Sequence, residues 1–386
     1  MEDVVREDER PSFKRCRRQW DLGSRSRQNL EPLRPRQVYD LERAVHDAMA
    51  LWYFPGMWEW DRSLVLRFAM EGFEKSMRKQ LDSYAARAGV APEQEIAWEA
   101  DRERGRRLLE HYFSWAPGAD AFTPVRVDTD FDANIPEPGT PGFDLVGPRG
   151  AIHYKGRVDL LVVDAYDAYW IVDHRLVDGG WEELDQLLLD ERGVGACWAW
   201  EIFYYGMQIA GTIYNELRLD AAVPPPGESP VASGPAAEGL SGRRRLYMQA
   251  AQLPDERVSV SGTDAFRRTR ITRSRAELAA CGVQIATEAR DMTSPTLPIY
   301  PHPSPAHCPG CAYQEPCRAM NQGMDPAPIL ARDYADRGAE EVEEGRLGAV
   351  TWSMNRGARP PSNFGGGTSA RRSRSVTPPA SLGEPE

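Results

Sequence analysis

Amphipathic helices are predicted for the first third of the chain. The segment at 39–54, YDLERAVHDAMALWYF, repeats apolar residues every three or four positions, which is the spacing of one helix face. This stripe includes His46 among aliphatic and aromatic residues. A second long helix, with a charged outer face, is expected at 93–116. The pattern therefore predicts a helical region at 37–120.

After about residue 150 the periodicity becomes that of strands. Two runs rich in β-branched and aromatic residues, 151–164 and 169–177, are separated by AYDA, which is typical of a hairpin connection. Further elements are expected beyond this hairpin, namely a helix at 184–207, strands at 210–219 and 243–253, and a basic helix at 265–292. Strands and helices in this mixture indicate the α/β class.

Composition divides the chain into four parts. An Arg-rich segment at 1–36 precedes the helical region, and the strand-rich part follows at 121–325. A Pro-, Gly- and Ser-rich loop is expected within it at 223–242. The last part, 326–386, is first acidic and then low in complexity, a composition typical of disorder.

The charge of the chain argues against coating nucleic acid through overall charge, since 58 acidic and 47 basic residues leave −11. The arginines are nevertheless concentrated, several beside aromatic residues, in runs at 13–20, 25–36, 242–247 and 266–275. Arginine binds phosphate and aromatic rings stack on bases. We therefore expect a local channel for single-stranded DNA, with Arg267, Arg268 and Arg270 among its contacts.

No membrane span is expected, because no run of about 18 apolar residues occurs. The N-terminus is charged and lacks the apolar region of a signal peptide, which indicates the cytoplasm. Thiols stay reduced there, so that clustered cysteines point to an inorganic centre more than to disulfides.

Three of the six cysteines lie in HCPGCAYQEPC, at Cys308, Cys311 and Cys317. A fourth ligand is required for a tetrahedral set, and Cys16 is the best candidate because its basic neighbours favour the thiolate. The alternatives are Cys197, Cys281 and, for a zinc site, His307. On spacing alone an iron–sulfur cluster is favoured over structural zinc.

The second strand of the hairpin ends in Asp173, His174 and Arg175. Residues i and i+2 of a strand share a face, so Asp173 and Arg175 are expected to project together while His174 points away. Strand pairing would bring Asp159, at the end of GRVD, opposite Asp173. Two such carboxylates suit Mg2+ or Mn2+. The plain alternative is a surface salt bridge with two incidental aspartates.

GRVD and WIVDHR resemble the GxxD and D-x-K elements of the PD-(D/E)XK nucleases, in particular their RecB-like branch. That branch includes the CRISPR-associated RecB-like exonucleases and the AddB subunit, in which one cysteine before the nuclease core and three after it hold an iron–sulfur cluster. The four cysteines at 16, 308, 311 and 317 reproduce this order and the C-x2-C-x5-C spacing. The resemblance implies a restriction-endonuclease-like core, a mixed β-sheet flanked by helices, with a helical N-terminal insertion and a [4Fe-4S] cluster on these cysteines.

The resemblance also implies a Mg2+ or Mn2+ site. Its ligands would be His46, on the early helix that carries a metal-binding histidine in this branch, with Asp159, Asp173 and the carbonyl of His174.

Three positions depart from the pattern of the family. Arg175 stands at the catalytic lysine, and an ungapped reading puts Arg192 and Ala196 at the Gln and Tyr of Q-x-x-x-Y. Arginine keeps the positive charge but cannot lose a proton. We therefore expect Arg175 to stabilise charge without acting as a base, and Arg192 to contact a DNA phosphate.

The resulting expectation is a metal-dependent DNA exonuclease with weakened activity. Single-stranded DNA or DNA ends would be the substrate, and a recombination, phage or CRISPR-type protein the partner. On this reading Arg175→Lys raises Mn2+-dependent cleavage and Asp173→Ala abolishes it. The alternatives are a catalytically degenerate nuclease fold that binds DNA ends or a protein, and an iron–sulfur redox or sensor protein.

Overall fold

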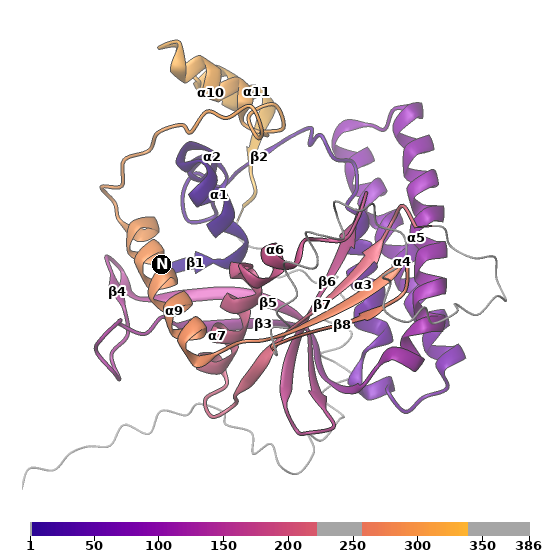
Figure 1. Ribbon diagram of the computed structural model, residues 1–386. Coiled ribbons are helices and arrows are strands. Elements are labelled where there is room, and N and C mark those ends of the chain that lie inside the picture. Colours follow the sequence, from indigo (N-terminus) through magenta and orange to yellow (C-terminus); the bar gives the residue numbers. More distant parts are fainter. Residues whose placement is uncertain (1, 222–256, 339–386) are drawn as a thin grey trace, which may run out of the picture.

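The computed structural model describes residues 2–221 and 257–338. It contains a mixed β-sheet with helices on both faces, so the expected α/β class is confirmed (Figure 1). The strands are β1 (Asp3–Arg6), β2 (Leu30–Pro32), β3 (Phe122–Asn134), β4 (Val146–Gly147), β5 (Gly150–Asp164), β6 (Tyr169–Val177), β7 (Ile209–Arg218), β8 (Val258–Gly262), β9 (Phe266–Thr272) and β10 (Tyr334–Asp336). The α-helices are α1 (Arg10–Arg15), α2 (Arg17–Gly23), α3 (Leu41–Trp52), α4 (Arg62–Ala88), α5 (Pro92–Ala119), α6 (Leu184–Leu188), α7 (Glu191–Phe203), α9 (Arg275–Thr293), α10 (Gln314–Asn321) and α11 (Ala327–Asp333).

The long strand β5 organises the sheet. Along one edge it pairs with β3, antiparallel, over residues 153–164. A strand has only two edges, and β1 and β6 share the other one: β1 pairs in parallel with residues 152–155, and β6 pairs antiparallel with residues 160–163. The short strand β4 pairs antiparallel with residues 150–151. We call the opening between these two pairings, at residues 156–159, the fork. Beyond β6 the sheet continues through β7 and β9 to β8.

Alternate residues of the β5–β6 hairpin enter two separate cores. Leu160 and Val172 pack in a core with α3, α4 and α5, whereas Leu161 and Ile171 pack in a core with α7 and α9. Figure 1 shows these two groups of helices on either side of the sheet. Within the described residues, no helix has both the length and the apolar character that a membrane span requires.

Most of the predicted elements are present, with two corrections. The basic helix expected at 265–292 is wrong in its first part, because residues 266–272 form β9, paired with β7. The helix begins only after Ser274, whose side chain accepts from the Glu277 backbone N–H in a capping box. The helix expected at 184–207 is two helices, since Asp190 caps the start of α7.

The hairpin at 151–177, the strand at 210–219 and the helices at 39–54 and 93–116 match observed elements. The expected strand at 243–253, the loop at 223–242 and the low-complexity tail beyond residue 338 lie outside the described residues. Residues 327–336, at the start of the last part, form α11 and β10, and β10 pairs with β2 from the N-terminal segment.

Candidate active site

The hairpin register brings the two aspartates together. Leu160 lies opposite Val172, so Asp159 and Asp173 occupy the next position outward, at the fork. The backbone N–H of His174 donates to Asp159 Oδ2 at 3.0 Å. Both carboxylates are buried or nearly so, with Asp173 only 6% exposed. Two aspartates from neighbouring strands thus share one small volume.

His46 approaches the same place from α3. Its Nε2 lies 2.8 Å from the carbonyl oxygen of His174, and its Nδ1 lies 3.5 Å from Asp159 Oδ1. Burial lowers the pKa of His46, but Asp159 outweighs this and raises it to about 9. Burial raises the pKa of Asp159, but His46 outweighs this and holds it below its usual range. The four residues expected to bind a divalent metal are therefore neighbours.

Glu7, which the sequence analysis missed, adds a third carboxylate at the fork. It follows β1 directly, and its Oε2 accepts from the backbone N–H of Arg157 at 3.4 Å. A methyl group on Gly156 would collide with this carboxylate and with the ring of Phe131, so the glycine of GRVD admits Glu7. Burial raises the pKa of Glu7 to about 7, against the opposing charge of Arg192.

One oxygen of Glu7, Oε1, is buried and accepts no hydrogen bond. Burial likewise raises the pKa of Asp173, which Arg192 and Arg175 oppose. The sequence around Glu7 gave little indication of a site residue, since an acidic run such as the one after Val4 and Val5 is common on protein surfaces. Only the pairing of β1 with β5 places it beside Asp159.

Arg192 lies among the three carboxylates. It comes from the first turn of α7. Its Nε lies 3.6 Å from Glu7 Oε1, its Nη1 lies 3.7 Å from Asp173 Oδ1, and its Nη2 lies 4.0 Å from Asp159 Oδ1. About half of its side chain, 53%, is exposed. The residue expected to contact DNA phosphate is thus paired with the acids of the site.

Arg175 is held far more tightly than Arg192. It binds Asp173 Oδ2 at 2.7 Å, Glu182 Oε2 at 2.6 Å and Asp190 Oδ2 at 2.7 Å. Its guanidinium also lies over the ring of Tyr214, 4.6 Å from the centroid. Asp173 and Arg175 project to the same side of β6, as expected for alternate residues. Arg175 is therefore a fixed, neutralised cation beside Asp173.

The ring of His174 points to the opposite side, into the core below α3. It stacks on Tyr53 at 5.9 Å between centroids, and Asn215 Nδ2 donates to its Nδ1 at 2.9 Å. Burial lowers the pKa of His174 to about 3, so this ring is neutral. Its backbone, not its side chain, faces the acids.

The arginines of β9 are paired within the protein. Arg268 is buried and binds Asp120 Oδ1 at 2.6 Å, where a DNA phosphate does not reach it. Arg267 binds Glu216, which is fully buried. Arg270 binds Asp164 at 2.8 Å and lies over Trp170. The three arginines expected to contact DNA are therefore each paired with an acidic side chain of the protein.

The four cysteines expected to bind a cluster line a single pocket of about 130 Å3. Each sulfur accepts a hydrogen bond. The backbone N–H of His302 donates to Cys16 at 3.4 Å, and that of Ser304 donates to Cys308 at 3.2 Å. The backbone N–H of Tyr313 donates to Cys311 at 3.4 Å, and the guanidinium of Arg18 donates to Cys317 at 3.6 Å. His307 also lines this pocket.

Cys197 and Cys281 lie elsewhere. Both are buried in the core formed with α7 and α9, and burial raises the pKa of their thiols to about 12 and about 11. They behave as small apolar residues and take no part in the cysteine pocket.

Neither cluster forms a closed metal site as it stands. In residues 2–221 and 257–338, no three His, Cys, Asp or Glu side chains converge closely enough to hold a metal ion. At the fork, Arg192 lies between the carboxylates.

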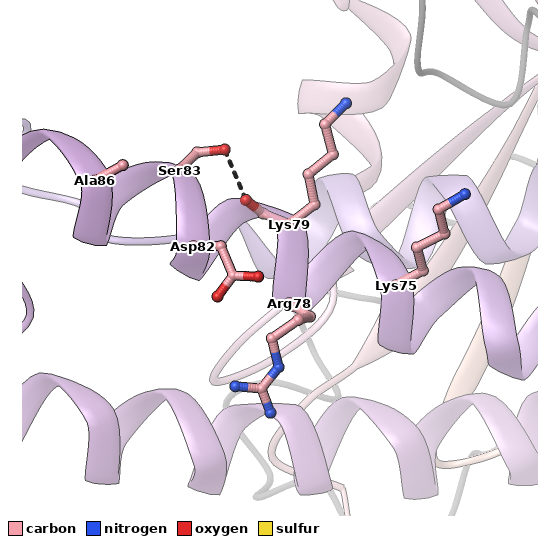
Figure 2. A pocket seen from close by; sticks show the side chains of 6 residues that line it. All are labelled: Lys75, Arg78, Lys79, Asp82, Ser83 and Ala86. Carbon is pink, nitrogen blue, oxygen red and sulfur yellow. Dashed lines mark hydrogen bonds between the residues drawn. The ribbon is translucent and has the colours of Figure 1, made fainter.

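A larger hollow lies away from both clusters, on the outer surface of α4. It measures about 520 Å3 and is lined by Lys75, Arg78, Lys79, Asp82, Ser83 and Ala86 (Figure 2). Arg78 lies over Trp98 of α5, 4.6 Å from the ring. The hollow is lined by acidic and basic groups side by side on a single helix, and we assign it no catalytic role.

Comparison with known proteins adds little. No family model matches the sequence, and no curated protein matches it. One similar solved structure is titled "Crystal structure of SSO0001"; it shares 10% sequence identity and aligns over 72% of this chain and 94% of that chain, with a TM-score of 0.27. A TM-score of this size supports no inference about fold or function.

Proposed function

We propose that this chain is a divalent-metal-dependent nuclease that hydrolyses phosphodiester bonds in DNA. The observation that carries the proposal is the meeting of Asp159 and Asp173 at the fork, where the pairing of β5 with β6 stops, with His46 beside Asp159 and against the carbonyl of His174. These are the ligands that the resemblance to RecB-like nucleases implies. Glu7 adds a carboxylate that the sequence pattern did not include.

The donor set fits a hard cation. Carboxylate and carbonyl oxygens with one imidazole suit Mg2+ or Mn2+. Glu7 Oε1 is a buried acceptor without a hydrogen bond, and a cation would satisfy it. A cation bound here would lower the pKa of a water molecule and stabilise the charge that develops on the phosphate.

The arginines then have separate roles. Arg175 holds Asp173 through Oδ2, which leaves Oδ1 directed at the fork. Because all three of its donor sites bind carboxylates, Arg175 acts as a positioning residue and a local positive charge. It cannot serve as a base at any working pH.

The four cysteines of the pocket would hold a [4Fe-4S] cluster in the same proposal. A cube-shaped cluster separates its four ligands, whereas one zinc ion draws them to a single point. The cluster is favoured because the four sulfurs line one pocket, each accepts a hydrogen bond, and their order along the chain is that of the RecB-like branch. The cluster would join Cys16, between α1 and α2, to Cys308 and Cys311 before α10 and to Cys317 within α10, and it would take no part in hydrolysis.

A second function is a non-catalytic DNA-end or protein-binding module. It is favoured by the two arginines at the acids, because Arg175 is fully paired and Arg192 lies where a cation would lie. Such pairing neutralises the acids without metal.

A nuclease assay distinguishes the two functions. We expect wild type to shorten end-labelled single-stranded DNA with Mn2+, and Asp173→Asn to lose at least a hundredfold in rate because a metal ligand is removed. Asp291→Asn is the control, since the Asp291 side chain is exposed and pairs with Arg17 of α2. Binding without cleavage by all three proteins would favour the module, and equal cleavage by wild type and Asp173→Asn would reject the site.

A further inference from the structure

Arg192 and Arg175 both face the acids, but only one of them is firmly bound. The three contacts of Arg192, at 3.6, 3.7 and 4.0 Å, exceed the range of about 2.7–3.2 Å for N–H···O hydrogen bonds. The contacts of Arg175 lie at 2.6 and 2.7 Å. Arg192 is therefore held by charge alone.

The position of Arg192 on α7 also makes it displaceable. It is the second residue of the helix, after Asp190 has capped the first turn. The positive end of the helix dipole disfavours a cation there. This repulsion partly offsets the attraction between the Arg192 guanidinium and the carboxylates. With 53% of the side chain exposed, rotation of its side-chain bonds turns the guanidinium to solvent without moving the helix.

The carboxylates that Arg192 contacts are the ones proposed to bind metal. A divalent cation takes carboxylate oxygens at about 2.0–2.6 Å. A guanidinium and a cation cannot both occupy the space between Glu7, Asp159 and Asp173.

We infer that Arg192 is an internal counter-ion that competes with the divalent cation for Glu7, Asp159 and Asp173. This inference rests on the proposed function, because it takes the metal site of the fork as given. Without metal, Arg192 neutralises the buried acids and stabilises the fold. Metal binding displaces the guanidinium to the mouth of the site, where it becomes free to contact a phosphate.

The test measures metal binding, not catalysis. Mn2+ is titrated into the full-length protein by calorimetry in the absence of nucleic acid. We expect Arg192→Gln, which removes the competing charge and keeps a polar side chain, to bind Mn2+ about tenfold more tightly than wild type. We expect Arg192→Lys, which keeps the charge, to stay within about twofold of wild type.

Thermal unfolding provides a second readout on the same proteins. Without metal, Arg192→Gln should melt below wild type because three acids lose their counter-ion, and Mn2+ should raise its Tm more than that of wild type. The matched control is Arg107→Gln, since Arg107 is 59% exposed and pairs with Glu103 at 3.7 Å, away from the fork. This control should change neither Mn2+ affinity nor the response of Tm to Mn2+.

The outcomes separate the inference from the function. Equal Mn2+ affinity in wild type and Arg192→Gln would overturn the competition and leave the metal site standing. Tighter binding by Arg192→Gln with no loss of Tm in the absence of metal would overturn the stabilising role of the counter-ion. If no variant binds Mn2+ while all remain folded by circular dichroism, the proposed function fails as well.

Discussion

At the scale of one residue, His174 contributes its ring to the core and its backbone groups to the candidate active site. Its ring is locked in the core by Tyr53 and by the amide of Asn215. Its backbone N–H binds Asp159 and its carbonyl oxygen contacts His46. The ring also lies edge-on to the ring of His46, with 6.0 Å between centroids. Packing of the ring therefore fixes the backbone groups that meet the acids.

Arg175 gives the first prediction at this scale. Arg175→Lys replaces a planar fork bound to three carboxylates by a single ammonium group, so we expect a loss of about 2 kcal/mol in the free energy of unfolding. Urea unfolding measures it. The same change in the exposed Arg107 should cost under about 0.5 kcal/mol, and an equal loss at both sites would contradict the positioning role.

The resemblance to nucleases predicts a second effect of Arg175→Lys, namely faster Mn2+-dependent cleavage. Rate and stability are measured separately, so a variant that is less stable but more active would agree with both expectations.

At the scale of elements, the fork is the feature that assembles the site. Because β1 and β6 divide one edge of β5 between them, residues 156–159 stay open to side chains from outside the hairpin. Glu7 enters from the end of β1, and Arg192 enters from α7. Neither would reach Asp159 if a single strand paired along the whole edge.

Gly156 tests the packing of the fork. In Gly156→Ala the added methyl group would overlap the ring of Phe131 and the carboxylate of Glu7, so we expect a loss of about 1–3 kcal/mol in the free energy of unfolding. Thermal or urea unfolding would measure it. Gly118→Ala is the control, since Gly118 lies in helix α5 and a methyl group there meets nothing within 4 Å. If Gly156→Ala leaves the free energy of unfolding unchanged or raises it, the fork has space for the methyl group and the prediction is wrong.

The elements also show how far the sequence could predict the site. The pairing of Asp159 with Asp173 was predictable because a short hairpin fixes its own register. Glu7 was not, because the pairing of β1 with β5 joins distant parts of the chain and leaves no local periodicity. The burial of Arg268 was likewise hidden, since its partner Asp120 follows a helix far earlier in the sequence.

At the scale of the whole molecule, contacts between the first and last described parts of the chain converge near the cysteine pocket. β2 pairs with β10, Tyr313 Oη donates to the carbonyl of Leu30, and the backbone N–H of Arg18 donates to the carbonyl of Tyr300. The spacing of Cys308, Cys311 and Cys317 and the basic neighbours of Cys16 predicted a common location, and the four residues do line one pocket. Local pattern could not predict the strand pair that joins the same two segments.

Cys16 tests the proposed cluster. Cys16→Ser removes one of four ligands, so anaerobically purified protein should lose most of its visible iron–sulfur absorbance and iron content, and its Tm should fall. Cys281→Ala is the control, because Cys281 is buried in the core formed with α7 and α9 and should leave the absorbance unchanged. If elemental analysis finds zinc and no iron in the purified protein, the proposed cluster is wrong and the cysteines hold a single zinc ion.

The separation of the pocket cysteines along the chain has a consequence for biosynthesis. A ribosome releases Cys16 early and Cys317 only near the end of the described chain. Under the proposed function, a cluster on all four cysteines could form only after residue 317 has been translated. Its insertion would therefore follow synthesis of the sheet strands β1 to β9 and of both helical layers.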